Sequence, residues 1–173
     1  AFDARKHGAA IVARRVAEIV ERHVEDKPRE WQPLVYCWRG GQRSGTLAWF
    51  LGQIGFRVQV LQGGYKAFRE QVREQLATLP LRLAYVVIAG RTGSGKTRLL
   101  QALAEAGAQV LDLEALAKHR GSVLGGLPFE PQPSQKAFET QVWTVLSAFD
   151  PSRPVYVESE SRKVGNVAVP ESL

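Results

Sequence analysis

The sequence predicts an α/β protein whose sheets are parallel. Short apolar runs alternate with segments of helical periodicity along all 173 residues, which is the pattern of repeated strand–helix units. Two of the apolar runs lead directly into glycine-rich turns, and a helical pattern follows each turn. We therefore expect two sheets, and the two turns are the candidate functional sites.

The first half of the chain contains three predicted helices and two predicted strands. Apolar residues recur at helical spacing over residues 9–24, and the segment from Asp26 to Pro28 stops the pattern. The other predicted elements are a strand over 33–36, a helix over 44–54 ended by Gly55, a strand over 58–61 and a helix over 65–76.

The second half follows a short connection, Thr78 to Pro80, which we take as the domain boundary. The two predicted domains cover residues 1–77 and 81–173. The elements predicted after the boundary are a strand over 83–89, a helix over 96–106, a strand over 109–111, a loop over 121–133, a helix over 134–149 and a strand over 154–157.

Composition excludes several classes of protein. No apolar run approaches the roughly 18–20 residues needed to cross a bilayer. The single cysteine cannot form an internal disulfide, which favours a reducing compartment, and we expect a cytoplasmic protein. The three histidines are far apart and show no metal-ligand spacing, so a structural zinc site is not expected.

Positive charge is concentrated around the two glycine-rich turns. The net charge is +6, and residues 37–100 contain ten Lys and Arg against two Glu. A basic centre favours anionic partners such as nucleic acid or phosphorylated small molecules. The alternative interpretation is a solvated basic surface without a partner.

The first turn surrounds the only cysteine, Cys37. Gly40 and Gly41 let the backbone curl so that amide N–H groups point inward, and the following helix adds the positive end of its dipole. Arg39 and Arg43 add formal charge. A thiol in such a cradle favours its anion and becomes a nucleophile near neutral pH. The alternative is a small buried hydrophobic cysteine.

Five residues separate Cys37 from Arg43, and the spacing Cys-x5-Arg-Ser leaves two chemistries open. One is phosphate-ester hydrolysis through a phosphocysteine. The other is attack on a selenium- or sulfur-bearing phosphate, with the chalcogen kept on the cysteine.

The second turn, residues 90–97, matches the phosphate-loop pattern G-x-x-x-x-G-K-[ST] between an apolar strand and a helix. Lys96 is expected to neutralise terminal phosphate oxygens, and the Thr97 hydroxyl to bind Mg²⁺. The remaining predicted phosphate-binding residues are Gly90, Gly93, Ser94 and Gly95. Candidate acidic partners at later strand ends are Asp112, with Glu114 nearby, Glu158 and Glu160.

Further segments carry a resemblance to known families. The Cys37 loop and the segment Val60 to Phe68, with its Gly-Gly pair before a helix, resemble the active-site loop and closing segment of rhodaneses. The order and spacing of several segments resemble the tRNA 2-selenouridine synthase family over nearly the whole chain. These segments cover residues 36–41, 63–66, 111–114, 119–122, 131–136 and 157–165.

The resemblance implies the C-terminal part of a rhodanese domain followed by the N-terminal part of a P-loop NTPase-like domain, with the remainder of each outside this chain. It implies a transferase that replaces the sulfur of 2-thiouridine at the tRNA wobble position with selenium from selenophosphate. The selenium would pass through Cys37. It also implies a geranylated thiouridine intermediate made from geranyl diphosphate, which would bind at the phosphate loop.

Two other functions stay open from the residues alone. One is a cysteine-dependent phosphatase fused to an ATP-binding kinase-like domain, and the other is a non-catalytic tRNA- or partner-binding module. For the tRNA partner, the candidate phosphate contacts are Arg57, Lys66, Arg69 and Arg73, and Trp38 is the candidate for stacking on an unpaired base.

Overall fold

In the computed structural model the chain divides into two compact units, residues 1–69 and residues 70–173. The structure describes residues 1–39, 41–91, 93–121, 125–126, 129–159 and 162–173. The division falls inside one helix, α3 (Gly64–Thr78).

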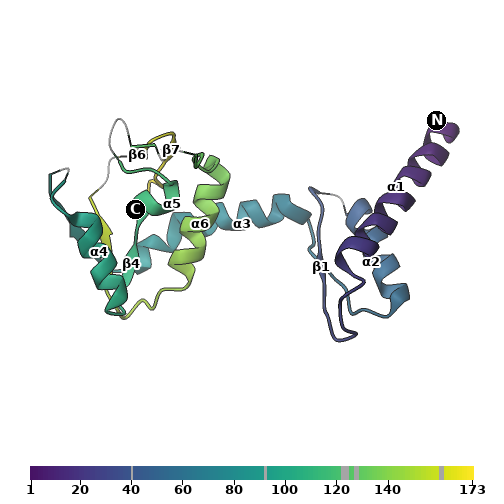
Figure 1. Ribbon diagram of the computed structural model, residues 1–173, viewed down its shortest axis with the longest axis horizontal. Helices are drawn as coiled ribbons and strands as arrows, with labels where there is room; N and C mark the ends of the chain where they lie inside the picture. Colours follow the sequence, from purple (N-terminus) through teal and green to yellow (C-terminus); the bar gives the residue numbers. More distant parts are fainter. Residues whose placement is uncertain (40, 92, 122–124, 127–128, 160–161) are drawn as a thin grey trace. The chain divides into compact units, whose positions relative to one another are not determined.

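The first unit is built around a two-stranded parallel sheet. Its elements before α3 are α1 (Phe2–His23), β1 (Leu34–Val35), α2 (Gln42–Ile54) and β2 (Gln59–Val60), of which α1, β1 and α2 are labelled in Figure 1. Leu34 lies opposite Gln59, and Val35 lies opposite Val60. The core consists of Val24, Val35 and Leu51, which come from three different segments, so burying them holds α1, β1 and α2 together.

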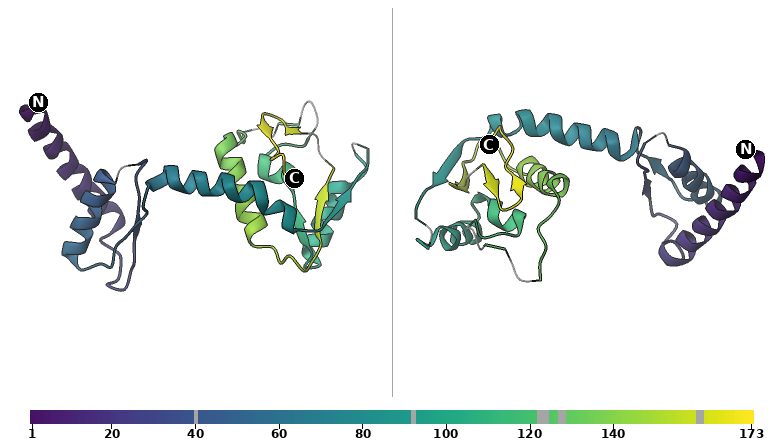
Figure 2. Two further views of the ribbon diagram at one scale, coloured as in Figure 1. Left: turned by 180° about the vertical axis from the view of Figure 1, so that it is seen from behind. Right: turned by 90° about the horizontal axis from the view of Figure 1, so that it is seen from above.

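The second unit contains a three-stranded parallel sheet with the order β3-β5-β4. Its strand β5 is central and is drawn in yellow in Figure 2. The elements are η1 (Pro80–Arg82), β3 (Tyr85–Ile88), α4 (Lys96–Glu105), β4 (Gln109–Leu111), α5 (Leu113–Ala117), α6 (Gln135–Ser147), β5 (Val155–Glu158), β6 (Lys163–Val164) and β7 (Val167–Ala168).

Register places the carboxyl ends of the three strands at one edge of this sheet. Val157 of β5 lies opposite both Val87 of β3 and Leu111 of β4. The phosphate-loop turn follows β3, α5 follows β4 and Ser159 follows β5. Ligands of open α/β sheets bind at this edge, because the loops that follow the strands gather there.

A buried polar side chain fixes the opposite edge of the sheet. The Gln109 amide nitrogen donates to the carbonyl oxygens of Asp150 and Arg153, each at 3.1 Å, and its oxygen accepts from the Asp150 N–H at 2.6 Å. Gln109 is 9% exposed. Its three hydrogen bonds satisfy backbone groups of the turn that leads into β5, and so join the starts of β4 and β5.

The predicted α/β architecture with parallel sheets is confirmed, and each predicted strand is found within two residues of its expected bounds. Helix α1 starts at Phe2, seven residues before the predicted start. Helix α5 and the antiparallel pair β6–β7 were not predicted. The domain limits 1–77 and 81–173 stay a prediction, as does the rhodanese assignment of the first part.

Among the residues that the structure describes, no helix has both the length and the apolar character that crossing a membrane requires.

Candidate functional site

Cys37 lies between the end of β1 and the start of α2, as the sequence predicts. Its Sγ accepts a hydrogen bond from the buried Ser44 hydroxyl at 3.4 Å, and the thiol lies 3.3 Å from the Arg39 carbonyl oxygen. Gly41, the residue before α2, has a φ of 77°, a left-handed conformation that glycine adopts without strain. The turn therefore curls around the sulfur.

Hydrogen bonds lower the pKa of the Cys37 thiol to about 7. The largest cause is the Ser44 hydroxyl, followed by the backbone N–H of Ser44, with smaller contributions from the backbone of Gly41 and Arg39. About half of a thiol with this pKa is thiolate at neutral pH, and the thiolate is the nucleophilic form. The structure thus contains an activated nucleophile.

The Gly63-Gly64 turn packs directly on the cysteine loop. A Cβ atom on Gly64, whose φ is 61°, would overlap the carbonyl oxygen of Cys37. The N–H of Tyr65 donates to that same oxygen at 2.8 Å, and the N–H of Lys66 donates to the Trp38 carbonyl at 3.1 Å. This close backbone approach, which only glycine permits, fixes the loop from its other side.

The other predicted residues of the cysteine loop are Arg39, Gly40 and Arg43. Arg39 and Arg43 are both exposed to solvent. Hydrogen bonds, rather than the charges of these arginines, are the largest causes of the lowered pKa of Cys37. Gly40 lies outside the described residues. Ser44 was not among the predicted site residues, although its position after Arg43 at the start of a helix was a usable signal.

The phosphate loop wraps into the N-terminus of α4. Gly93 and Gly95 have φ values of 81° and 85°. A Cβ atom on Gly90 would lie 2.6 Å from the Ser94 Oγ, so a side chain there would require the Ser94 hydroxyl to move. Lys96 Nζ donates to the Gly90 carbonyl at 2.9 Å, which holds the ammonium over the loop. This geometry suits an anion, because glycine-lined backbone, a cation and a helix N-terminus converge.

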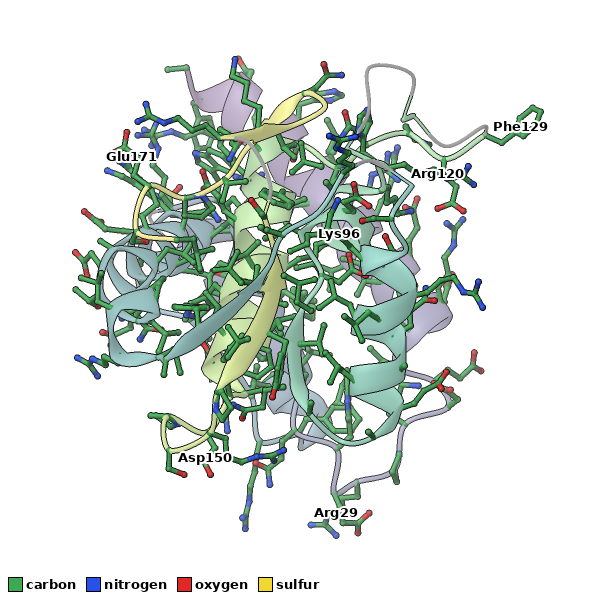
Figure 3. All side chains as sticks on the ribbon, turned by 90° about the vertical axis from the view of Figure 1, so that its left-hand side faces the viewer. Arg29, Lys96, Arg120, Phe129, Asp150 and Glu171 are labelled. Atoms are coloured by element: carbon green, nitrogen blue, oxygen red, sulfur yellow. The ribbon has the colours of Figure 1, made fainter. Side chains whose placement is uncertain are left out.

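A cavity of about 550 Å³ opens over this loop. All six predicted phosphate-binding residues line it, together with Glu158. Arg98 and Arg120, which the sequence analysis did not propose as site residues, add two cationic side chains to the lining. Figure 3 shows Lys96 and Arg120 at the same end of the unit. The cavity is therefore more basic than the motif alone indicated.

Of the candidate acidic partners, Glu158 and Glu114 line the cavity, whereas Asp112 does not. Glu158 is 3% exposed, and its Oε1 accepts from the Glu114 N–H at 3.3 Å, so these two line the cavity side by side. Asp112 caps α5 instead, accepting from the Ala115 N–H at 2.8 Å, and does not line the cavity. Glu160 lies outside the described residues.

Magnesium binding at Thr97 stays a prediction. Thr97 is half-buried in the cavity lining. Within the described part of the chain, no group of three or more His, Cys, Asp or Glu side chains could hold a metal ion. A magnesium ion here would therefore depend on Thr97, Glu158 and the phosphates of a ligand.

The predicted tRNA contacts divide by exposure. Arg57, Lys66 and Arg73 are exposed, whereas Arg69 is 8% exposed. Trp38 is 51% exposed, and its ring lies 5.3 Å from that of Tyr65 with an angle of 31° between them. Three of the four basic residues thus remain available for phosphate contacts, and Trp38 presents an aromatic surface beside Cys37.

Comparison with known proteins relates both units to one family. The family model described as the tRNA 2-selenouridine synthase AAA domain matches residues 83–173. A protein of Nitrosomonas europaea named tRNA 2-selenouridine synthase is 41% identical over 81% of this chain and 37% of its own length. Proteins of the same name from Shewanella denitrificans and Psychromonas ingrahamii are 36% and 34% identical over 97% and 98% of the chain, and over 45% and 47% of their own lengths.

The chain therefore spans less than half the length of these curated relatives. No solved structure matches it.

The role of Ser44 can be tested by the pH dependence of Cys37 alkylation. Because the Ser44 hydroxyl is the largest cause of the lowered pKa, Ser44→Ala should move the half-maximal rate with iodoacetamide to higher pH. A pKa rise of roughly one unit would slow alkylation at pH 7 about fivefold. Thr46→Ala is the matched control on the same helix, because its hydroxyl donates to Gln42 at 2.9 Å and not to the sulfur. Equal profiles for the two variants would contradict this role of Ser44.

Proposed function

This chain belongs to the tRNA 2-selenouridine synthase family, and we propose that it acts in replacing the sulfur of 2-thiouridine at the tRNA wobble position with selenium. The observation that carries the proposal is the thiol of Cys37, activated by hydrogen bonds in a turn shaped to hold an oxyanion. We place the reaction in the cytoplasm, on a tRNA substrate. The cysteine part is proposed to be the C-terminal portion of a rhodanese domain, and the phosphate loop to belong to a P-loop domain.

Selenophosphate is the proposed selenium donor at Cys37. The Cys37 thiolate first exchanges with a small-molecule disulfide, which makes a mixed disulfide. The selenium of the donor attacks the Cys37 sulfur, an S–Se bond forms, and the S–S bond breaks with a thiolate leaving. Water then hydrolyses the Se–P bond, phosphate leaves, and selenium stays on Cys37 as Cys37–S–Se⁻. The backbone N–H groups that surround the sulfur would bind the oxygens of the donor, as they would bind any tetrahedral oxyanion.

Geranyl diphosphate is the proposed ligand of the phosphate loop. The thiocarbonyl sulfur of the base attacks C1 of the geranyl group, a C–S bond forms and the C–O bond breaks. The diphosphate leaves with the electron pair, and its charge is met by Lys96, the loop backbone and Arg120. A phosphate cradle of this kind recognises phosphates and not a base, so a diphosphate suits it as well as ATP.

Selenium then replaces the geranylated sulfur. The Cys37-bound selenium attacks C2 of the base, a C–Se bond forms, the C–S bond breaks and geranylthiolate leaves. A small-molecule thiol cleaves the remaining Se–S bond, and a second thiol restores Cys37 with release of a disulfide. Prenylation makes the sulfur a better leaving group, which links the two chemical steps.

The two aspartates of the first unit, the usual candidates for a phosphatase general acid, both pair with neighbouring lysines. A phosphocysteine pathway requires a general acid for the leaving group. Asp26 accepts a hydrogen bond from Lys27 at 2.8 Å, which lowers the pKa of Asp26 and keeps it ionised. Asp3 pairs with Lys6 at 2.6 Å on the exposed surface of α1. The lowered pKa of Asp26 does not suit a general acid at neutral pH.

Intact-mass measurement tests the selenium step. After incubation with selenophosphate and a small-molecule disulfide, the chain should gain the mass of one selenium atom and release phosphate, and Cys37→Ser should abolish both. Ser147→Ala, at an exposed position, is the control that should keep the gain. A gain of phosphate mass on the cysteine would favour the phosphatase mechanism instead. Release of phosphate with no change in mass would show that Cys37 carries no selenium.

The salt dependence of tRNA binding tests the basic stretch. If Arg57, Lys66 and Arg73 contact phosphates, replacing all three by Ala should reduce the slope of log affinity against log salt by roughly 2, at about 0.7–0.9 per contact. Affinity for different tRNAs should fall alike, because phosphate contacts carry no sequence information.

The control for this experiment removes the same charge elsewhere. Arg5, Arg14 and Arg22 are exposed residues of α1, and their triple Ala variant should keep the parental slope. Equal losses in the two triple variants would mean that overall charge, and not this stretch, governs tRNA binding.

A further inference from the structure

A second cavity of the 70–173 unit adjoins the phosphate cavity. It has a volume of about 820 Å³, and Glu158 and Ser159 line both cavities. These two residues lie where the central strand β5 ends. A ligand with its phosphates over Lys96 that extended past Glu158 and Ser159 would enter the second cavity, which we call the side chamber.

One wall of the side chamber is an apolar face of the sheet. Tyr85 and Val87 alternate along β3, and Val87 lies opposite Val157 of β5, so the three side chains share one face. Val87 is 58% exposed, which is high for an apolar side chain in a parallel sheet. The Tyr85 hydroxyl is buried without a hydrogen-bond partner among the described residues, and burial raises its pKa to about 12. This wall is therefore mainly apolar.

The other walls come from the start of α5 and from the C-terminal segment. Leu113, Ala168, Val169 and Pro170 contribute apolar side chains, and Arg162, Lys163 and Glu171 contribute charged ones. In Figure 3, Glu171 of the side chamber and Arg120 of the phosphate cavity lie on opposite sides of the view. The side chamber therefore has a mixed lining with one apolar wall. It meets the phosphate cavity at the end of β5.

We propose that the side chamber binds the hydrocarbon chain of a prenyl diphosphate whose diphosphate lies in the phosphate cradle. The proposal rests on the function proposed above for Lys96 and its loop. An apolar chain needs no hydrogen-bond partners and gains affinity from leaving water, which the exposed Val87 face provides. The arrangement places the C–O bond that breaks beside Ser159 and the carboxylate of Glu158, at the junction of the two cavities.

A series of ligands separates the chamber from the cradle. The series consists of inorganic diphosphate, dimethylallyl diphosphate, geranyl diphosphate and farnesyl diphosphate, each titrated against the 173-residue chain. The affinity should rise at least tenfold from inorganic diphosphate to geranyl diphosphate, because chain burial adds to phosphate binding. Lys96→Ala should weaken the whole series, inorganic diphosphate included.

Two neighbouring valines of β3 provide matched variants. Val87→Asp places a charge in the side chamber and should remove most of the rise in affinity with prenyl chain length. The affinity for inorganic diphosphate should stay unchanged. Val86→Asp changes the adjacent residue, which is 43% exposed and faces the other side of the sheet, and should keep the gain. Val169→Asp tests the facing wall and should act like Val87→Asp.

The outcomes distinguish the two proposals. Equal affinity of the parent for inorganic and prenyl diphosphates would overturn the chamber and leave the diphosphate cradle standing. No binding of any diphosphate, or no effect of Lys96→Ala, would overturn the function proposed for the loop. If Val86→Asp loses the rise in affinity with prenyl chain length as Val87→Asp does, the hydrocarbon chain does not bind in the side chamber. Tighter binding of ADP than of geranyl diphosphate, lost in Val87→Asp, would assign the chamber to a nucleoside.

Discussion

The structure depends on one constraint that appears twice: backbone must curl tightly where a parallel strand ends and a helix begins. At Cys37 the curl requires Gly41 in a left-handed conformation and Gly64 against the Cys37 carbonyl. At Lys96 it requires Gly93 and Gly95. In both turns the same geometry gathers backbone N–H groups and a helix N-terminus around one point, which favours an anion there. In the cysteine turn this anion is the thiolate itself, and in the phosphate loop it would be a ligand.

The two turns therefore suit complementary parts of the proposed function. In the proposed prenylation a diphosphate leaves, and the basic side chains around the phosphate loop would meet its charge. The proposed selenium transfer requires a nucleophile that is ionised at neutral pH, and the Ser44 hydroxyl with the surrounding backbone favours the Cys37 thiolate. The exposed positions of Arg39 and Arg43 leave them available to contact the oxyanion donor.

The sequence predicted most of the fold because its signals are local. Apolar periodicity located the strands, and Gly55, which follows α2 with a φ of 110°, marked a helix end. The missed β6–β7 pair depends on a distant partner. The β6–β7 turn is held by Gln132, whose oxygen accepts from the Asn166 N–H at 2.8 Å and whose nitrogen donates to the Val164 carbonyl at 3.1 Å. Likewise, motif spacing found Lys96 but not Arg120, because only the folded chain brings Arg120 to the loop.

Glycine backbone shapes the cysteine loop, and we infer that this shape sets the reactivity of the Cys37 thiol. The most direct measurement is the pH profile of Cys37 alkylation in Gly64→Ala, with Gly52→Ala as control, because a Cβ on Gly52 meets nothing within 4 Å. In Gly64→Ala the new Cβ must displace the Cys37 carbonyl, so the pKa of Cys37 should rise above its value of about 7. The control should keep the parental profile. An unchanged profile in a folded Gly64→Ala variant would contradict the account.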